Sequence, residues 1–356
     1  MASITERLRG IPGVGPLVAV IVFYSLIGGD AVNGLVIDEA SPLVAAVMAG
    51  VFGTIPLVLL AERAALFRRG RRPLLRKLGE GTLINRMAVS NTFVIPLTLL
   101  SLQRLEALGT VIALLWVGPL VVAIKKMVTG SPRRLSSLLW LPLATPGMVL
   151  LTRPWEGNAD LWGVLLALGA AACYGNFLLT YDRLGEALGN RVNVAIAESM
   201  LRSTAALAAV SAIVIITLAA FGRTVPGITP GPDWLSWRVV GFTLLSGLLT
   251  GCVAQVGQNL IFGQRLMKAA TFSVLTAVEP VVALSLGWWV LGHQPTGLDV
   301  IGSLLVTAAG AGCFYQLDVR GKPRVPGRLP LPETPEHIDR REPAAWISWS
   351  SDSATW

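Results

Sequence analysis

Two stretches of the sequence repeat one pattern: residues 99–124 read LLSLQRLEALGTVIALLWVGPLVVAI, and residues 260–285 read LIFGQRLMKAATFSVLTAVEPVVALS. A shift of 161 residues aligns them without a gap, with nine identities in 26 positions. Apolar segments often match by chance, so the weight rests on the shared polar triplet Gln-Arg-Leu and on the alignment of Pro119 with Pro280. The pattern predicts that the two halves of the chain are copies of one unit.

The composition is that of a membrane protein. Of the 356 residues, 53% are hydrophobic and 14% are charged, against roughly 45 to 50% and 25% in soluble domains. A helix needs about 20 mostly apolar residues to cross a bilayer. The sequence therefore predicts an all-α integral membrane protein with ten spans, at residues 16–36, 42–61, 83–102, 107–124, 138–152, 162–180, 194–221, 239–262, 270–291 and 298–316.

Basic residues are distributed unevenly over the predicted connections. If the N-terminus is cytoplasmic, 23 Lys and Arg lie on the cytoplasmic side and four lie outside, while two fall within spans. This asymmetry follows the positive-inside rule. We therefore expect a multi-pass protein with both termini in the cytoplasm. Residues 1–15 precede the first span, and residues 317–356, rich in Pro, Ser and charge, are expected to be a disordered tail.

The two copies, residues 16–152 and 162–316, are predicted to have opposite orientations. Each contains five spans, and an odd number reverses the direction in which equivalent segments cross the bilayer. Inverted repeats recur in secondary transporters, because a site between two oppositely oriented halves can be opened to either face. The expected architecture is ten transmembrane helices arranged as two inverted-topology five-helix repeats.

Three motifs resemble those of a known family. They are Gly-Pro-Leu at 118–120, Leu-Ala-Leu-Gly-Ala-Ala-Ala-Cys-Tyr at 166–174, and Glu-Pro-Val-Val-Ala at 279–283, followed by Leu-Gly-His-Gln-Pro-Thr at 291–296. Across residues 15–316 the chain resembles the EamA-type proteins of the drug/metabolite transporter superfamily, most closely the branch of threonine and homoserine exporters. The resemblance implies export of such an amino acid across the bacterial cytoplasmic (inner) membrane. The chain departs from the usual pattern at His293, where an acidic residue often stands.

Glu279 is the most informative candidate for the transport site. An ionisable group near the middle of a span costs about 2.5 to 3.5 kcal/mol on insertion scales and marks a functional site. Pro280 follows it and frees a backbone carbonyl. Glu279 is expected either to carry protons during transport or to fix packing through a hydrogen bond. In the other half, Gly118 and Pro119 allow close approach of a ligand or of a neighbouring helix.

Further polar residues within the spans are candidate ligand contacts. Asp30 and Asn33 lie three residues apart and hence on one face of a helix. Asp30 is expected either to attract an ammonium group or to be hydrated near the outer surface. The remaining candidates are expected to contact substrate or to bond a neighbouring helix, and they are Asn91, Tyr174, Asn176, Gln255 and Gln258.

Other classes of function find little support in the sequence. It contains no Walker loop, no HExxH or GxSxG motif and no paired metal ligands, so we expect neither an enzyme nor a metal or cofactor site. The uneven distribution of basic residues indicates the orientation of the protein in the membrane rather than nucleic-acid binding. The predicted partners are a small-molecule substrate, protons and the lipid bilayer, and the sequence leaves a homodimer open. The alternatives are an exporter of amphipathic drugs and a non-transporting membrane scaffold or sensor.

Overall fold

The computed structural model describes residues 13–66, 78–118, 120, 124, 139–153, 155, 160–188, 192–225, 227–263 and 279–321. These residues form helices and their connections, and the described part contains no strand. The all-helical prediction is therefore confirmed for this part of the chain. The first five residues of the predicted tail belong to the last helix, which ends at Gly321, and the rest of the tail lies outside the described residues.

The helices follow the predicted spans closely. Those before residue 160 are α2 (Val14–Gly34), α3 (Ile37–Ala40), α4 (Pro42–Leu66), α5 (Leu78–Leu105), α6 (Leu108–Leu115) and α8 (Leu141–Thr152). Those after residue 160 are α9 (Leu161–Leu188), α10 (Val192–Ala220), α11 (Trp237–Ser246), the π-helix η4 (Gly247–Val253), α12 (Ala254–Gln258), the π-helix η5 (Asn259–Gly263), α14 (Glu279–Leu291) and α15 (Gly297–Gly321).

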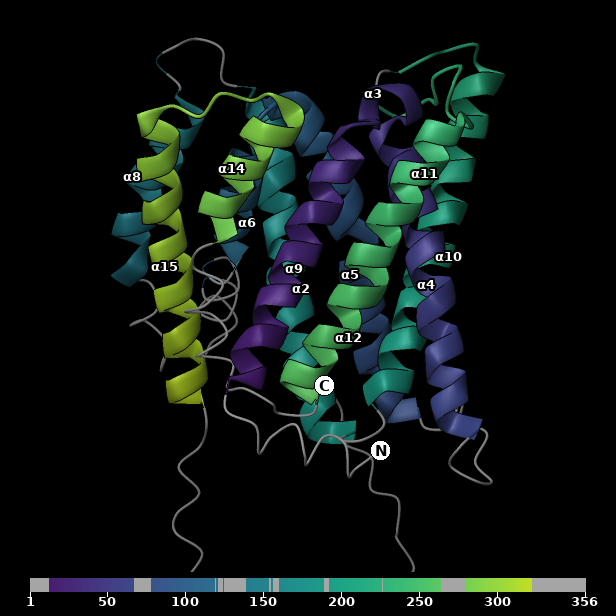
Figure 1. The fold of residues 1–356 in the computed structure, drawn as a ribbon, viewed down its shortest axis with the longest axis horizontal. Coiled ribbons are helices and arrows are strands. Elements are labelled where there is room, and N and C mark those ends of the chain that lie inside the picture. The colour runs from purple at the N-terminus through teal and green to yellow at the C-terminus, as the bar shows by residue number, and fades with distance from the viewer. Residues whose placement is uncertain are drawn as a thin grey trace, which may run out of the picture. The chain divides into compact units, whose positions relative to one another are not determined.

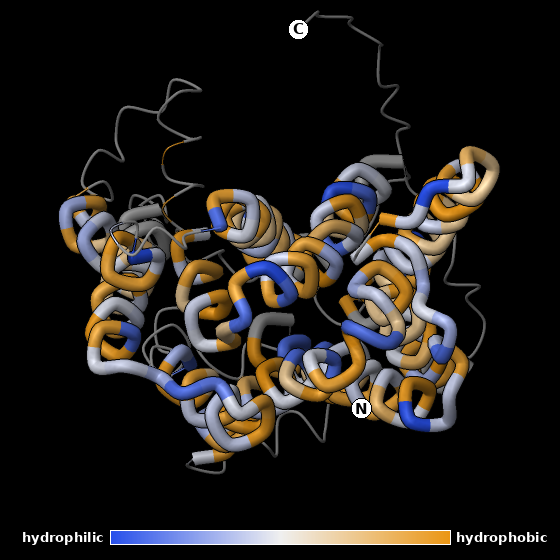
Figure 2. Tube along the Cα trace, turned by 90° about the horizontal axis from the view of Figure 1, so that it is seen from above, coloured by the Kyte–Doolittle hydropathy of each residue, from blue (hydrophilic) through white to orange (hydrophobic). Residues whose placement is uncertain are grey.

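Six helices are long and apolar enough to cross a membrane. They run over Val14–Gly34, Pro42–Ala61, Gly81–Leu105, Leu161–Tyr181, Val194–Ala220 and Trp237–Ile261. The other four predicted spans coincide with α6, α8, α14 and the apolar part of α15, which are shorter among the described residues. Apolar residues lie on the outer sides of the helices as well as between them (Figure 2). Helices that are apolar all round are typical of a membrane environment, and the chain is a multi-pass membrane protein.

Helices from before residue 160 pack against helices from after residue 160. α5 packs on α9, α2 packs on η4 and α12, α14 packs on α6, and α15 packs on α8. Figure 1 shows these elements running roughly alongside one another, with the start of α2 and the end of α15 at the same end of the bundle. The functional site is therefore built from both halves of the chain.

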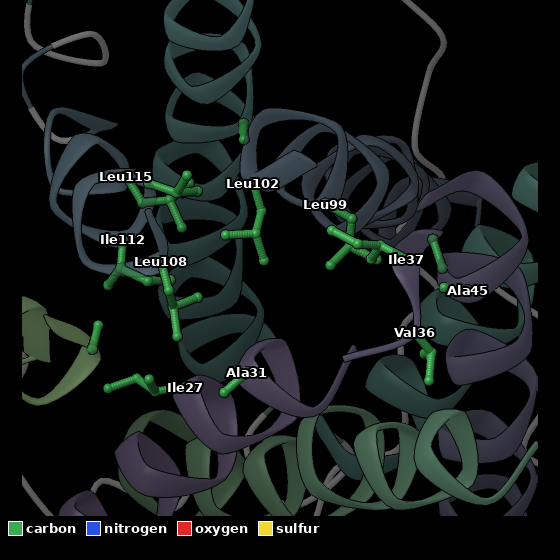
Figure 3. Packing of buried hydrophobic residues seen from close by; sticks show 14 of the residues in the cluster. Ile27, Ala31, Val36, Ile37, Ala45, Leu99, Leu102, Leu108, Ile112 and Leu115 are labelled. Carbon is green, nitrogen blue, oxygen red and sulfur yellow. The ribbon is translucent and has the colours of Figure 1, made fainter. Parts of the chain in front are cut away.

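Two apolar clusters occupy different levels of the bundle. The first includes Ala31, Leu102 and Leu108, and its members on α2, α5 and α6 face a common interior (Figure 3). The second includes Met87 of α5 and Tyr181 of α9. The buried residues of the two clusters are separated by roughly three turns of helix along α5 and by roughly two turns along α9, and that interval is more polar.

The helix that runs from Trp237 to Gly263 is held by close backbone contacts. A Cβ on Gly53 of α4 would lie 2.5 Å from the carbonyl oxygen of Gly247, and one on Gly29 of α2 would lie 2.2 Å from Cγ2 of Thr250. Glycine at these positions thus lets α2 and α4 approach η4 directly. Small residues at helix interfaces serve this purpose in membrane proteins, and the contact places Asp30 beside η4.

Candidate functional site

A cavity lined by both polar and apolar side chains lies among helices from both halves of the chain. It has a volume of about 80 Å³, whereas one water needs roughly 10 to 15 Å³ on the same measure, so it has room for several waters or for a small solute. Six of the predicted site residues line it, namely Asp30, Asn91, Tyr174, Gln255, Gln258 and Glu279. The other lining residues are Leu26, Val94, Ile95, Thr98, Ile112, Leu115, Trp116, Phe177, Met200, Thr250 and Gly251.

Two carboxyl groups face this cavity. Glu279 is buried at the start of α14, and Asp30 of α2 is partly exposed to the cavity. Their charges are close enough to act on one another and on the hydroxyl of Tyr174. The indole of Trp116 donates a hydrogen bond to the Glu279 carboxyl. Because α14 packs on both α6 and α2, the folding of these three elements brings the groups together.

Two amides add acceptors to the same cavity. Gln255 and Gln258 on α12 are 5% and 1% exposed, and the side-chain oxygen of each has no hydrogen-bond partner among the described residues. Residues three apart lie on one face of a helix, so both amides reach the cavity together. The hydroxyl of buried Tyr181 donates to the backbone carbonyl of Gln255 at 3.3 Å, which ties α12 to α9.

Asn91 and Asn176 form hydrogen bonds between helices. The amide nitrogen of Asn91 on α5 lies 3.1 Å from both Met200 Sδ and Ser203 Oγ of α10. The amide nitrogen of Asn176 on α9 donates to Ser90 Oγ of α5 at 2.6 Å. Asn91 thus lines the cavity and fixes packing at once, whereas Asn176 has a packing contact and no place in the lining.

Four other predicted residues are not among the described cavity lining. Gly118 contacts α9 closely, because a Cβ there would lie 2.4 Å from the carbonyl oxygen of Ala171. Asn33 is buried one turn beyond Asp30, and Pro280 is buried next to Glu279. Pro119 lies outside the described residues. The structure therefore brings together titratable and amide groups, whereas Gly118, Asn33 and Pro280 are not part of the described lining.

Sequence reasoning missed the role of Trp116. Trp116 is not among the predicted site residues. Trp288 and Trp289, two other tryptophans of the apolar segments, are exposed on the surface of α14. Trp116 instead lines the cavity and bonds Glu279. The repeat contained a signal for this position, because the shift of 161 residues aligns Gly118 with Glu279 and so places Trp116 two residues before the equivalent of the acid.

A half-buried histidine follows the C-terminal end of α14. The Nδ1 atom of His293 is buried without a hydrogen-bond partner among the described residues. Burial lowers the pKa of His293 below its ordinary value, and the charge of Glu106 raises it in part. Within the described residues, no group of three or more His, Cys, Asp or Glu side chains has the arrangement of a metal site.

Known proteins resemble this chain. Residues 161–314 match the profile of the EamA-like transporter family. The threonine/homoserine exporter RhtA of Salmonella typhimurium strain LT2 is 27% identical over 228 residues, which are 64% of this chain and 68% of that protein. The exporter of the same name from Escherichia coli K12 is 26% identical over 215 residues, 60% of this chain and 64% of that protein.

One solved structure, titled "Crystal structure of protein", aligns with 86% of this chain and 99% of its own, at 14% identity and a TM-score of 0.48. That likeness is too distant to support a conclusion. The sequence match is more specific, since it spans α9 through most of α15. The segment that is similar to the EamA-like transporter family, residues 161–314, contributes Tyr174, Gln255, Gln258 and Glu279 to the cavity.

Proposed function

We propose that the protein is a secondary transporter that exports a small polar metabolite, an amino acid such as threonine or homoserine, by alternating access coupled to protons. It acts in the bacterial inner membrane with both termini in the cytoplasm. The observation that carries the proposal is the pair of carboxyls, Asp30 and Glu279, facing one cavity between the two halves of the chain. The proposed substrate is the one after which the similar exporters are named.

Alternating access requires a central site that can be closed from either side. The apolar clusters around Leu102 and around Met87 lie on opposite sides of the cavity along α5, and each is suited to act as a barrier to polar solutes. Rearranging one cluster at a time would expose the cavity to one compartment at a time. Glu279 is the candidate for coupling, since a carboxyl exposed alternately to the two sides can take up and release a proton.

The helix contacts support an inverted repeat. Exchange of the two halves converts α5 on α9 into the helix of η4 and α12 on α2, and it converts α5 on α10 into the helix of η4 on α4. Both members of each pair are in contact, as a two-fold relation between the halves requires. A symmetric pair of halves around one cavity is the arrangement that rocking between two states uses.

The carboxyls and amides of the cavity lining support a polar substrate, while the apolar side chains that form most of its surface are also compatible with an amphipathic drug. Eight of the seventeen lining residues have polar or titratable side chains, including both carboxyls and two amides. A drug exporter would be expected to have fewer of these and more aromatic surface. The scaffold alternative depends on the tail rather than on the cavity, so the two functions are separable by experiment.

The proposal is tested with purified protein in liposomes. Counterflow of radiolabelled threonine is expected, and a proton gradient is expected to drive it further. Glu279→Gln should abolish the proton-driven part, whereas Asp38→Asn, which removes an exposed carboxyl of α3 outside the cavity, should leave it unchanged.

Two results would contradict the proposal. Equal pH-driven flux in wild type and Glu279→Gln would remove this residue from coupling. Removal of residues 322–356 should leave flux intact in a carrier, so complete loss of function in that truncated chain, with the helices still folded, would favour the scaffold.

A further inference from the structure

We propose that Asp30, Glu279, Gln255 and Gln258 form a subsite for the ammonium group of the transported molecule, so that the carrier binds amines and zwitterions and rejects anions. This inference rests on the proposed function, because it names what the same cavity recognises. It goes further in assigning recognition to the positive end of the substrate and in making a carboxylate on the substrate dispensable.

The charges of the cavity select for a cation. Two carboxyls face it, and none of its seventeen described lining residues is Lys, Arg or His. Like charges brought together in a poorly solvated space disfavour one another, and a positive group between them relieves this repulsion. An anion in the same space would add to the negative charge without meeting a positive partner.

The amides supply the remaining hydrogen-bond acceptors. The side-chain oxygens of Gln255 and Gln258 are buried and unpartnered among the described residues, and both residues line the cavity. An ammonium group has three N–H donors and no acceptor. Two amide oxygens and a carboxylate are therefore a matching set of acceptors, and a bound ammonium would satisfy buried oxygens that otherwise lack partners.

The structure holds these acceptors near one another. Gly29 permits close contact between α2 and Thr250 of η4, which sets Asp30 against the helix that continues into α12. Tyr181 fixes the backbone of α12 at Gln255. α14, which begins with Glu279, packs on α2. The four side chains thus come from three elements, of which α2 packs on both α12 and α14.

Two of the N–H donors in the cavity are already engaged. The indole of Trp116 donates to Glu279, and the amide nitrogen of Asn91 donates to groups of α10. A substrate carboxylate would have to displace one of these contacts. The ammonium group, by contrast, meets acceptors that are free to bind it, so it is expected to dominate recognition.

Two fragments of threonine test whether the ammonium group rather than the carboxylate is recognised. 1-Amino-2-propanol retains the ammonium group and lacks the carboxylate, while 3-hydroxybutyrate retains the carboxylate and lacks the ammonium. Titration calorimetry with the full-length protein in detergent should show binding of the amine and at least about tenfold weaker binding of the acid, the difference expected from losing charge-assisted hydrogen bonds. Excess threonine should displace the amine.

Variants locate the subsite. Asp30→Asn and Gln258→Leu should each weaken amine binding by about tenfold, and Asp38→Asn, outside the cavity, should not change it. Size-exclusion chromatography identifies variants that do not fold. The comparison of amine with acid in the wild type stands whether or not the variants fold.

Equal binding of acid and amine, or no binding of the amine, would overturn the subsite. Displacement of the amine by Na⁺ as readily as by threonine would also overturn it, because the site would then bind inorganic cations. Amine binding without any transport would contradict the proposed export and support the subsite. Threonine transport without amine binding would support export and overturn the subsite.

Discussion

Gly251 of η4 and Gly53 of α4 are in direct backbone contact: a Cβ on Gly251 would lie only 2.6 Å from the Cα of Gly53. Any side chain at Gly251 must push the two helices apart. Since Thr250 and Gln255 project from the same helix into the cavity, this contact also sets the position of part of the lining.

We expect Gly251→Ala to destabilise the protein by roughly 1 to 3 kcal/mol, the usual cost of overpacking. Gly241→Ala is the matched control, because a Cβ added to Gly241 of α11 would have no other atom within 4 Å and alanine favours a helix. Thermal unfolding in detergent should show a lowered midpoint for Gly251→Ala alone. Equal midpoints for the two variants would contradict the prediction.

A buried hydroxyl pair links α4 to α10. Thr54 Oγ1 and Thr204 Oγ1 lie 2.9 Å apart. Thr54→Val and Thr204→Val should each reduce the free energy of unfolding by about 1 kcal/mol, and the double variant should lose less than the sum, because neither hydroxyl is then left without its partner. Thr217→Val, at an exposed position of α10, is the control. Additive losses would show that the pair is not coupled.

Two ion pairs at the ends of helices should differ in strength. Arg153 and Asp299 join α8 to α15 at 2.7 Å with side chains 20% and 14% exposed, while Arg104 and Asp160 lie 3.5 Å apart and are 56% and 26% exposed. Asp160 accepts hydrogen bonds from the backbone N–H groups of Trp162 and Gly163, and Asp299, in the first turn of α15, accepts one from the N–H of Thr296. The amide oxygen of Asn can accept the same bonds, so the change to Asn mainly removes the ion pair.

Asp299→Asn should therefore lower the unfolding midpoint more than Asp160→Asn, whose exposed pair is worth about 0 to 1 kcal/mol. High salt should reduce the small effect of Asp160→Asn further, because exposed charges are screened more than buried ones. The prediction fails if the two variants unfold at the same temperature.

His293 should make the protein sensitive to acid. Burial lowers its pKa in the folded state, so below the ordinary value of 6.5 the unfolded chain binds the proton more readily. Its contribution to stability is present above that pH and is lost as the pH falls. The decrease in unfolding temperature on acidification should be smaller in His293→Gln, which cannot take up the proton. An unchanged decrease would show that His293 does not contribute.

Trp116→Phe should impair transport by weakening the orientation of Glu279. Loss of a hydrogen bond to a charged group costs about 1.5 to 3 kcal/mol, so we expect about a tenfold decrease in proton-driven threonine flux. Trp289→Phe provides the control, since Trp289 is 85% exposed on α14. Similar flux in both variants would exclude a role for the indole N–H.

Much of the cavity could be predicted because polar residues are rare in apolar spans. Glu279, Asp30, Gln255 and Gln258 are conspicuous in their segments, and each lines the cavity. Asn176 is equally conspicuous but bonds Ser90 instead. Composition identifies a polar residue within a span, but which neighbour it meets depends on how helices rotate against one another.

Features that depend on contacts between distant segments were not predictable. Trp116 acquires its role only because α6 packs on α14, and an aromatic residue in an apolar stretch gives no sign of this. The π-helix η4 likewise lies where glycines of α2 and α4 are in close contact with it. Helical periodicity describes one element at a time and therefore misses both.

The widened turns of η4 set the direction in which the following residues point. A π-helical turn takes up one more residue than an α-helical turn, and one residue advances a helix by about 100°. If Gly247–Val253 reverted to α-helix, Gln255 and Gln258 would rotate away from Asp30 and Glu279. The chemistry of the cavity therefore depends on the number of residues in this stretch as much as on their identity, because the widened turn accommodates one residue that an α-helical turn would not.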